Sequence, residues 1–178
     1  VYILSRNQNY LKDIEIRQSF NEDYTKCTLN IKCDIDNADS IVYGLVHPLG
    51  DVIDEGEVNN KEFTLPIENP VLWNAEKPYL YELLFEYEGE IISQKVGFVT
   101  YKLGDEHEFL VNGTEVKLKG VNHHDTHPTN GWAMTDDEIL SDLKLMKKLN
   151  INTIRTSHYP PTPKFLEMTI ISIGVAII

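Results

Sequence analysis

Residues 116–160 constrain the fold of this chain most strongly, because their pattern reads as a strand, a loop, a helix and a second strand in succession. An apolar run at 116–121 predicts a buried strand. Thr135 and Glu138 have the spacing of a capping box, in which a hydroxyl and a carboxylate satisfy free N–H groups at the start of a helix. β-Branched residues at 151–156 then predict the second strand.

The predicted helix between these strands has one apolar face and a charge distribution that suits its dipole. Acidic residues occupy the first turn, lysines occupy the last turns, and Asn150 is expected to end the helix. The apolar face comprises Ile139, Leu140, Leu143, Met146 and Leu149.

Two strands joined by a helix are expected to be parallel, with a right-handed connection. The carboxyl ends of both strands then lie at one edge of the sheet, where ligand-binding and catalytic residues of parallel α/β folds gather. Asn122, His124 and Asp125 follow the first strand, and Arg155 and His158 lie at and just beyond the end of the second. The sequence therefore predicts that His124 and His158 are neighbours, although 34 positions separate them.

Residues 1–99 show short alternating runs instead of helical periodicity. The clearest strand is 27–35, in which apolar residues occupy every second position. Further strands are predicted at 14–17, 41–46, 63–67, 79–87 and 96–99, with turn residues between them. Short strands at this spacing predict an antiparallel β-sandwich of about 100 residues.

Residues 100–115 connect this sandwich to the strand–helix–strand unit. The pair Asn112-Gly113 stands between two short β runs and predicts a two-residue hairpin, because both residue types tolerate a positive φ angle. We therefore expect two domains, a sandwich at 1–99 and an α/β region at 100–178.

The net charge of −12 argues against a nucleic-acid backbone or an anionic membrane surface as a partner. The longest apolar run, at 170–178, is far shorter than the roughly 20 residues of a membrane helix. We therefore expect neither nucleic acid nor membrane among the partners. The chain opens at Val1 with no signal-peptide pattern, so part of the native N-terminus is expected to be missing.

Both cysteines, Cys27 and Cys33, lie on the same face of one predicted strand, roughly 20 Å apart at about 3.3 Å per residue. A disulfide requires Cα atoms within about 7 Å of each other. We therefore expect reduced, buried thiols, which favour a cytoplasmic location.

Two motifs carry a family resemblance, GVNHHDTHP at 120–128 and NTIRTSHYP at 152–160. Together with 69–73 and 77–81 in the sandwich region, they resemble glycoside hydrolase family 2 over nearly the whole chain. Further segments look most like the β-galactosidases of that family; these are 131–134 and 143–147.

The resemblance implies an antiparallel immunoglobulin-like β-sandwich followed by the first β/α units of an incomplete TIM (β/α)8 barrel, since a closed barrel needs about 250 residues. It also implies hydrolysis of terminal non-reducing β-D-galactose residues, as in the lactose-type substrates of carbohydrate catabolism, with retention and two glutamates. In the family these glutamates follow later barrel strands, so this chain should hold no catalytic residue and should be inactive by itself. The full enzyme is expected to be a homo-oligomer. Any Mg²⁺ and Na⁺ should bind it through residues outside this chain, which is expected to hold no cofactor.

Three residues match positions of the family's sugar site, and two more are assigned to the loop beside it. His124 and His158 match residues that contact galactosyl hydroxyls and so are expected to bind substrate. Arg155 matches a residue that supports the nucleophilic carboxylate, whose ionised form is favoured by a fixed positive charge. Asn122 and Asp125 are expected to organise the surrounding loop.

Alternative interpretations stay open. A β-glucuronidase-type enzyme of the same family shares elements of both motifs, and a non-catalytic sugar-binding or structural sandwich module would account for the first domain alone. Loop 123–127 contains residue types that ligate metals, but adjacent loop residues rarely converge on one ion, so we expect no metal site. The neighbours Ser157 and His158 do not form a nucleophile–base pair.

The resemblance ends before the C-terminus. The family pattern has Asp or Asn near position 170 and Gly at 173, whereas this chain has Ile170 and Ile173, with Gly174 one place later. We expect 169–178 to be a divergent strand, or a segment altered by truncation or by a sequencing slip.

Overall fold

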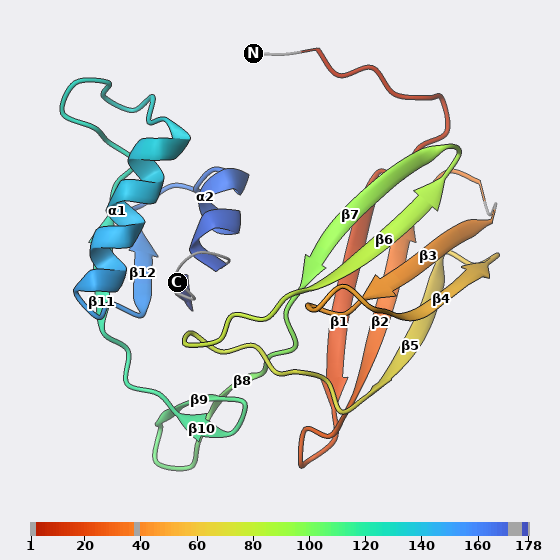
Figure 1. The fold of residues 1–178 in the computed structure, drawn as a ribbon, viewed down its shortest axis with the longest axis horizontal. Helices are drawn as coiled ribbons and strands as arrows, with labels where there is room; N and C mark the ends of the chain where they lie inside the picture. Colours follow the sequence, from red (N-terminus) through yellow and green to blue (C-terminus); the bar gives the residue numbers. More distant parts are fainter. Residues whose placement is uncertain (1–2, 38–39, 171–175, 178) are drawn as a thin grey trace. The chain divides into compact units, whose positions relative to one another are not determined.

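The structure is a computed structural model that describes residues 3–37, 40–170 and 176–177. The chain forms two compact units (Figure 1). Unit 1 comprises Val1–Leu72 and Leu80–Phe98, and unit 2 comprises Trp73–Tyr79 and Val99–Ile178. The segment Trp73–Tyr79 lies between the two ranges of unit 1 in the sequence but belongs to unit 2.

Unit 1 is an antiparallel β-sandwich, as the sequence predicted. One sheet has the order β1-β2-β5 and the other has the order β4-β3-β6-β7, which fits an immunoglobulin-like arrangement. The strands are β1 (Asp13–Phe20), β2 (Lys26–Asp34), β3 (Ile41–Val46), β4 (Val52–Val58), β5 (Glu62–Glu68), β6 (Tyr81–Tyr87) and β7 (Glu90–Val96).

Strict alternation on β2 and β6 builds the core of unit 1, because every second side chain of a strand faces the opposite sheet. The buried residues on these two strands are Cys27, Leu29, Ile31, Cys33, Tyr81, Leu83, Phe85 and Tyr87. Tyr81 and Phe98 pack edge to face with ring centroids 4.7 Å apart. Burial of each large side chain contributes about 1.5–3 kcal/mol. Tyr79, which the sequence placed in the same row, lies before β6 and is 41% exposed.

Both cysteines are free thiols buried on β2, as predicted. Among the residues that the structure describes, no helix is long and apolar enough to cross a membrane.

Unit 2 opens with a small antiparallel sheet of β8 (Tyr101–Leu103), β9 (Phe109–Val111) and β10 (Thr114–Glu115). The predicted hairpin at Asn112-Gly113 is confirmed, with φ angles of 50° and 74° that suit a two-residue turn. The Asn112 side chain also donates to the Trp73 carbonyl at 2.9 Å and accepts from the Thr100 N–H at 2.8 Å. Asn112 thus connects the hairpin turn to the backbone of the segment Trp73–Tyr79.

The rest of unit 2 is a parallel β/α arrangement. Its strands β11 (Gly120–His123), β12 (Thr153–Thr156) and β13 (Ala176–Ile177) pair in that order, all parallel. Helix α1 (Asp136–Lys148) connects the first two strands, and α2 (Pro163–Met168) follows the second. The predicted β–α–β unit is confirmed, whereas α2 was not predicted. A small core supports the unit and comprises Ile139, Leu143, Ile154 and Phe165.

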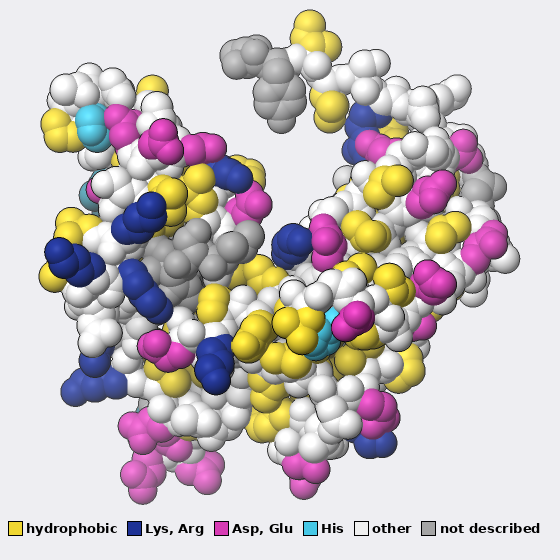
Figure 2. Space-filling view, viewed as in Figure 1, with side chains coloured by type: hydrophobic (Ala, Val, Ile, Leu, Met, Phe, Trp, Pro, Cys, Tyr) yellow, Lys and Arg dark blue, Asp and Glu magenta, His cyan; other side chains and the backbone are white. Residues whose placement is uncertain are grey.

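Helix α1 has the predicted ends. Thr135 is the N-cap of a complete capping box with Glu138, and Asn150 follows the helix with a φ angle of 64°. The Thr135 N–H donates to Glu138, which holds the pKa of that carboxyl below its ordinary value. Figure 2 shows basic side chains gathered over the α1 region, where lysines complement the negative end of the helix dipole.

The predicted strand at 116–121 is wrong in its bounds, because β11 begins only at Gly120. The N–H of Val116 donates to Phe109 and keeps that residue with the hairpin. The Asn152 side chain accepts from the Lys119 N–H and donates to the Lys117 carbonyl. These two backbone groups therefore bind a side-chain amide instead of the backbone of a neighbouring strand. Leu118 is accordingly 41% exposed instead of buried.

The C-terminal expectation is tested only in part. Thr169 and Ile170 continue the helical turn of α2, and Ala176–Ile177 form β13 against β12. Ile173 and Gly174, where the sequence departs from the family pattern, lie outside the described residues.

We predict that Leu83→Ala lowers the free energy of unfolding of the chain by about 2–5 kcal/mol, because it leaves a cavity in the sandwich core. Leu49→Ala is the matched control, since Leu49 is 79% exposed and Leu83 is 0% exposed. The control should change stability by less than about 0.5 kcal/mol. Urea unfolding followed by circular dichroism measures both, and equal effects would contradict the described core.

Burial raises the pKa of both thiols from 9.0 to about 11. Between pH 9.0 and about 11 the folded chain keeps these thiol protons, whereas the unfolded chain loses them. The contribution of the thiols to the free energy of unfolding is therefore fully present below pH 9.0 and is lost as the pH rises to about 11. We predict that the stability gap between the wild type and the Cys27→Ala/Cys33→Ala variant narrows as pH rises from 9 to 11. Urea unfolding at several pH values measures the gap, and a constant gap would refute the assignment.

Candidate functional site

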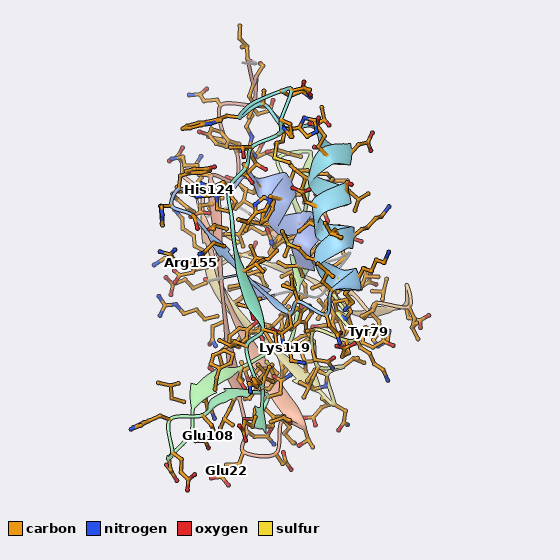
Figure 3. All side chains as sticks on the ribbon, turned by 90° about the vertical axis from the view of Figure 1, so that its left-hand side faces the viewer. Glu22, Tyr79, Glu108, Lys119, His124 and Arg155 are labelled. Atoms are coloured by element: carbon orange, nitrogen blue, oxygen red, sulfur yellow. The ribbon has the colours of Figure 1, made fainter. Side chains whose placement is uncertain are left out.

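The parallel pairing of β11 with β12 places the polar ends of the two strands side by side. In this register Asn122 lies opposite Arg155, and His123 lies opposite Thr156. Just beyond the ladder the Ser157 N–H donates to the His123 carbonyl at 2.9 Å. The two segments therefore stay hydrogen-bonded where the strands end. Figure 3 shows β11 leading from Lys119 to His124, with Arg155 on the neighbouring strand.

The predicted pairing of His124 with His158 is confirmed. Their imidazole rings meet edge to face with centroids 5.9 Å apart, and both side chains are exposed. Arg155 lies beside them, because its Nη2 is 3.3 Å from His158 Nδ1. Its Nη1 donates to Asn122 Oδ1 at 3.4 Å. Three kinds of polar side chain thus converge at one exposed sheet edge.

Asp125 joins this cluster through Tyr159. The Tyr159 hydroxyl accepts from the Asp125 N–H at 2.9 Å, and the Tyr159 ring lies 6.3 Å from the His124 ring. The structure therefore brings all five predicted site residues into one neighbourhood. Tyr159 was not among them, although its place directly after His158 was a usable signal.

His123 has a different position from its neighbour His124. It is 8% exposed, and its ring stacks on Phe165 with centroids 5.1 Å apart. Its Nδ1 lies 3.4 Å from an Asp125 carboxylate oxygen, and its Nε2 lies 3.4 Å from an Asp142 carboxylate oxygen. One imidazole thus links the loop, helix α1 and helix α2. Alternation along β11 places His123 on the same face as Val121, which is the signal that could have revealed this role.

The loop between β11 and α1 is fastened to the start of the helix. His127 and Gly131 exchange backbone hydrogen bonds of 2.8 and 2.9 Å, which close the loop at its base. His127 Nδ1 lies 3.0 Å from Glu138 Oε1, and the Asn130 side chain donates to the same oxygen at 2.6 Å. The capping carboxylate therefore orders the loop as well as the helix.

An exposed aromatic residue sits on this loop. Trp132 is 81% exposed, and its ring stacks on Tyr159 with centroids 6.1 Å apart and planes inclined by 21°. Trp73 is 5% exposed, so the two tryptophans of the chain lie in opposite environments.

The residues of this edge do not fit a metal site. Within 3–37, 40–170 and 176–177, no three His, Cys, Asp or Glu side chains are arranged to hold an ion. Mg²⁺ requires a near-octahedral set of oxygen ligands. His123 and His127 carry ring nitrogens instead, and each ring already lies beside a carboxylate of the protein. The expectation that Mg²⁺ and Na⁺ bind through residues outside this chain stays a prediction.

Comparison with protein families gives two matches. Residues 9–98 match the family described as "Glycosyl hydrolases family 2". Residues 102–178 match the domain described as "Glycosyl hydrolases family 2, TIM barrel domain". The parallel β/α arrangement of unit 2 is thus similar to the start of such a barrel.

Two relatives are similar over most of the chain. A β-galactosidase of Staphylococcus xylosus is 37% identical over 171 residues, which cover 95% of this chain and 17% of the relative. A β-galactosidase of Actinobacillus pleuropneumoniae is 38% identical over 169 residues, which cover 94% of this chain and 16% of the relative. The chain therefore spans less than a fifth of the length of these relatives.

Two solved structures share the fold. A β-glucuronidase of Parabacteroides merdae has a TM-score of 0.84 at 21% identity, covering 96% of this chain and 23% of that chain. A β-D-glucuronidase of Dictyoglomus thermophilum has a TM-score of 0.86 at 23% identity, covering 96% and 29%. At this level of identity the likeness shows the fold alone.

We predict that His123→Ala destabilises unit 2 by about 2–3 kcal/mol, because the substitution removes a buried ring and leaves a cavity against Phe165. His124→Ala, the same change at the adjacent exposed position, should cost less than about 0.5 kcal/mol. Amide hydrogen exchange of β12 measures the opening of this unit. Equal protection in the two variants would show that His123 does not anchor the loop.

Proposed function

The chain belongs to glycoside hydrolase family 2, and from this we propose that it is part of a β-galactosidase that hydrolyses terminal β-D-galactose residues with retention. The relatives with 37% and 38% identity are both β-galactosidases, which supports this substrate over others. The observation that carries the proposal is the convergence of His124, Arg155 and His158 at the carboxyl edge of β11 and β12.

His124 and His158 are proposed to bind the hydroxyl groups of the galactosyl ring. Both imidazoles are exposed at the sheet edge and approach each other at right angles, so their nitrogens can serve different hydroxyls of one sugar. Hydrogen bonds of this kind accelerate the reaction when they strengthen as charge develops in the transition state.

Arg155 is proposed to support the nucleophilic carboxylate. Its guanidinium is exposed and oriented by Asn122 and His158, which leaves further N–H groups of the planar fork for an incoming carboxylate. A nearby positive charge keeps such a carboxylate ionised. Asn122 and Asp125 hold the surrounding backbone and side chains in place.

The proposed mechanism requires two carboxylates about 5–5.5 Å apart that act as nucleophile and as acid/base. We propose that both glutamates come from the remainder of a longer enzyme, so that the 178-residue chain is inactive by itself. We also propose that the full enzyme is cytoplasmic and homo-oligomeric, with any Mg²⁺ and Na⁺ held outside this chain.

A β-glucuronidase is the second candidate, because the solved structures with this fold include two β-glucuronidases. Their identity of 21% and 23% is well below that of the β-galactosidases, which is why we favour galactose. A purely structural sandwich module is less favoured, since a spacer has no need of the polar cluster at the sheet edge.

We predict that the full-length protein containing this chain hydrolyses p-nitrophenyl β-D-galactoside, and that His158→Ala lowers kcat by about 10²–10³-fold, as for other lost transition-state hydrogen bonds. Arg17→Ala, a change at an exposed sandwich position, is the control and should leave kcat unchanged.

Comparison of p-nitrophenyl β-D-galactoside with p-nitrophenyl β-D-glucuronide separates the two candidates. Preference for the glucuronide would replace the galactosidase proposal. Turnover of the galactoside by the purified 178-residue chain would refute the proposed origin of the two glutamates.

A further inference from the structure

Trp132 is the most exposed aromatic ring near the polar edge of β11 and β12, with 81% of its surface accessible. The galactosyl contacts proposed above do not use it. The exposed indole offers apolar surface that a bound ligand can bury.

Several hydrogen bonds hold the loop that carries Trp132. The Ala133 N–H donates to the Asn130 carbonyl at 3.3 Å and closes a turn, in which Trp132 is the third residue. Glu138 on α1 holds Asn130 at 2.6 Å, and the backbone bonds between His127 and Gly131 close the base of the loop. The indole is thus presented by a fastened turn, which lowers the entropic cost of binding.

A row of rings joins Trp132 to the proposed galactosyl site. Trp132 stacks on Tyr159 at 6.1 Å, Tyr159 lies 6.3 Å from His124, and His124 lies 5.9 Å from His158. Tyr159 is fixed in turn by the Asp125 N–H. The indole is therefore linked to His124 through the single ring of Tyr159, which places it next to the proposed galactosyl site.

We propose that Trp132, backed by Tyr159, is a stacking platform for the sugar that leaves when the galactosidic bond is cleaved. A pyranose has one apolar face of C–H groups and a polar rim of hydroxyls. The flat indole suits the apolar face of such a ring. The proposal rests on the proposed galactosidase function and makes Trp132 a determinant of specificity for disaccharides.

The test compares lactose with methyl β-D-galactoside in the full-length enzyme and its Trp132→Ala and Trp132→Phe variants. Methyl galactoside has the same galactosyl ring but no second sugar. Loss of the platform should raise the ratio of the two KM values by about fivefold to tenfold in Trp132→Ala, with less change in Trp132→Phe, which retains a ring. The inhibition constant of galactose should stay within about twofold of the wild type.

Equal changes for the two substrates in Trp132→Ala, or no change for either, would overturn the platform. An equal change together with a lower melting temperature would assign Trp132 to packing against another part of the enzyme instead. Inactivity of the unmodified enzyme toward every β-galactoside would refute the proposed function itself, which is a different outcome from an active enzyme whose KM ratio does not respond to Trp132.

Discussion

The parallel pairing of β11 with β12 is the interaction on which the candidate site depends. Only this register sets Asn122 opposite Arg155 and lets the Ser157 N–H reach the His123 carbonyl. A parallel ladder needs a crossover between its strands, and α1 supplies it with both ends specified by the sequence. A slip of one residue would turn every side chain to the other face of the sheet and disperse the cluster.

The two units differ in how much apolar surface supports them. Unit 1 buries long alternating rows from two sheets, whereas the described core of the parallel unit rests on four buried residues. In that small core, a polar residue carries part of the structural role, because His123 stacks on Phe165 and faces carboxylates from the loop and from α1. The rigidity of the polar edge therefore depends on a few contacts close to the site itself.

Neighbouring histidines show how one motif serves two purposes. Successive side chains at the end of a strand point in opposite directions, so His123 faces the core while His124 faces solvent. The first holds the backbone, and the second is free to meet a ligand. A similar division occurs in the following loop, where backbone hydrogen bonds between His127 and Gly131 close the base and Trp132 is exposed to solvent.

The sequence by itself determined the features that depend on local periodicity and local hydrogen bonding. These are the alternation of β2 and β6, the Asn112-Gly113 turn, the capping box of α1 and, through the handedness of a β–α–β crossover, the meeting of His124 with His158. Only the tertiary structure decided where β11 begins, because the Asn152 side chain, distant in sequence, binds the backbone at Lys117 and Lys119. It also decided that Asp125 and Asp142 flank His123, since such contacts depend on packing that no local pattern encodes.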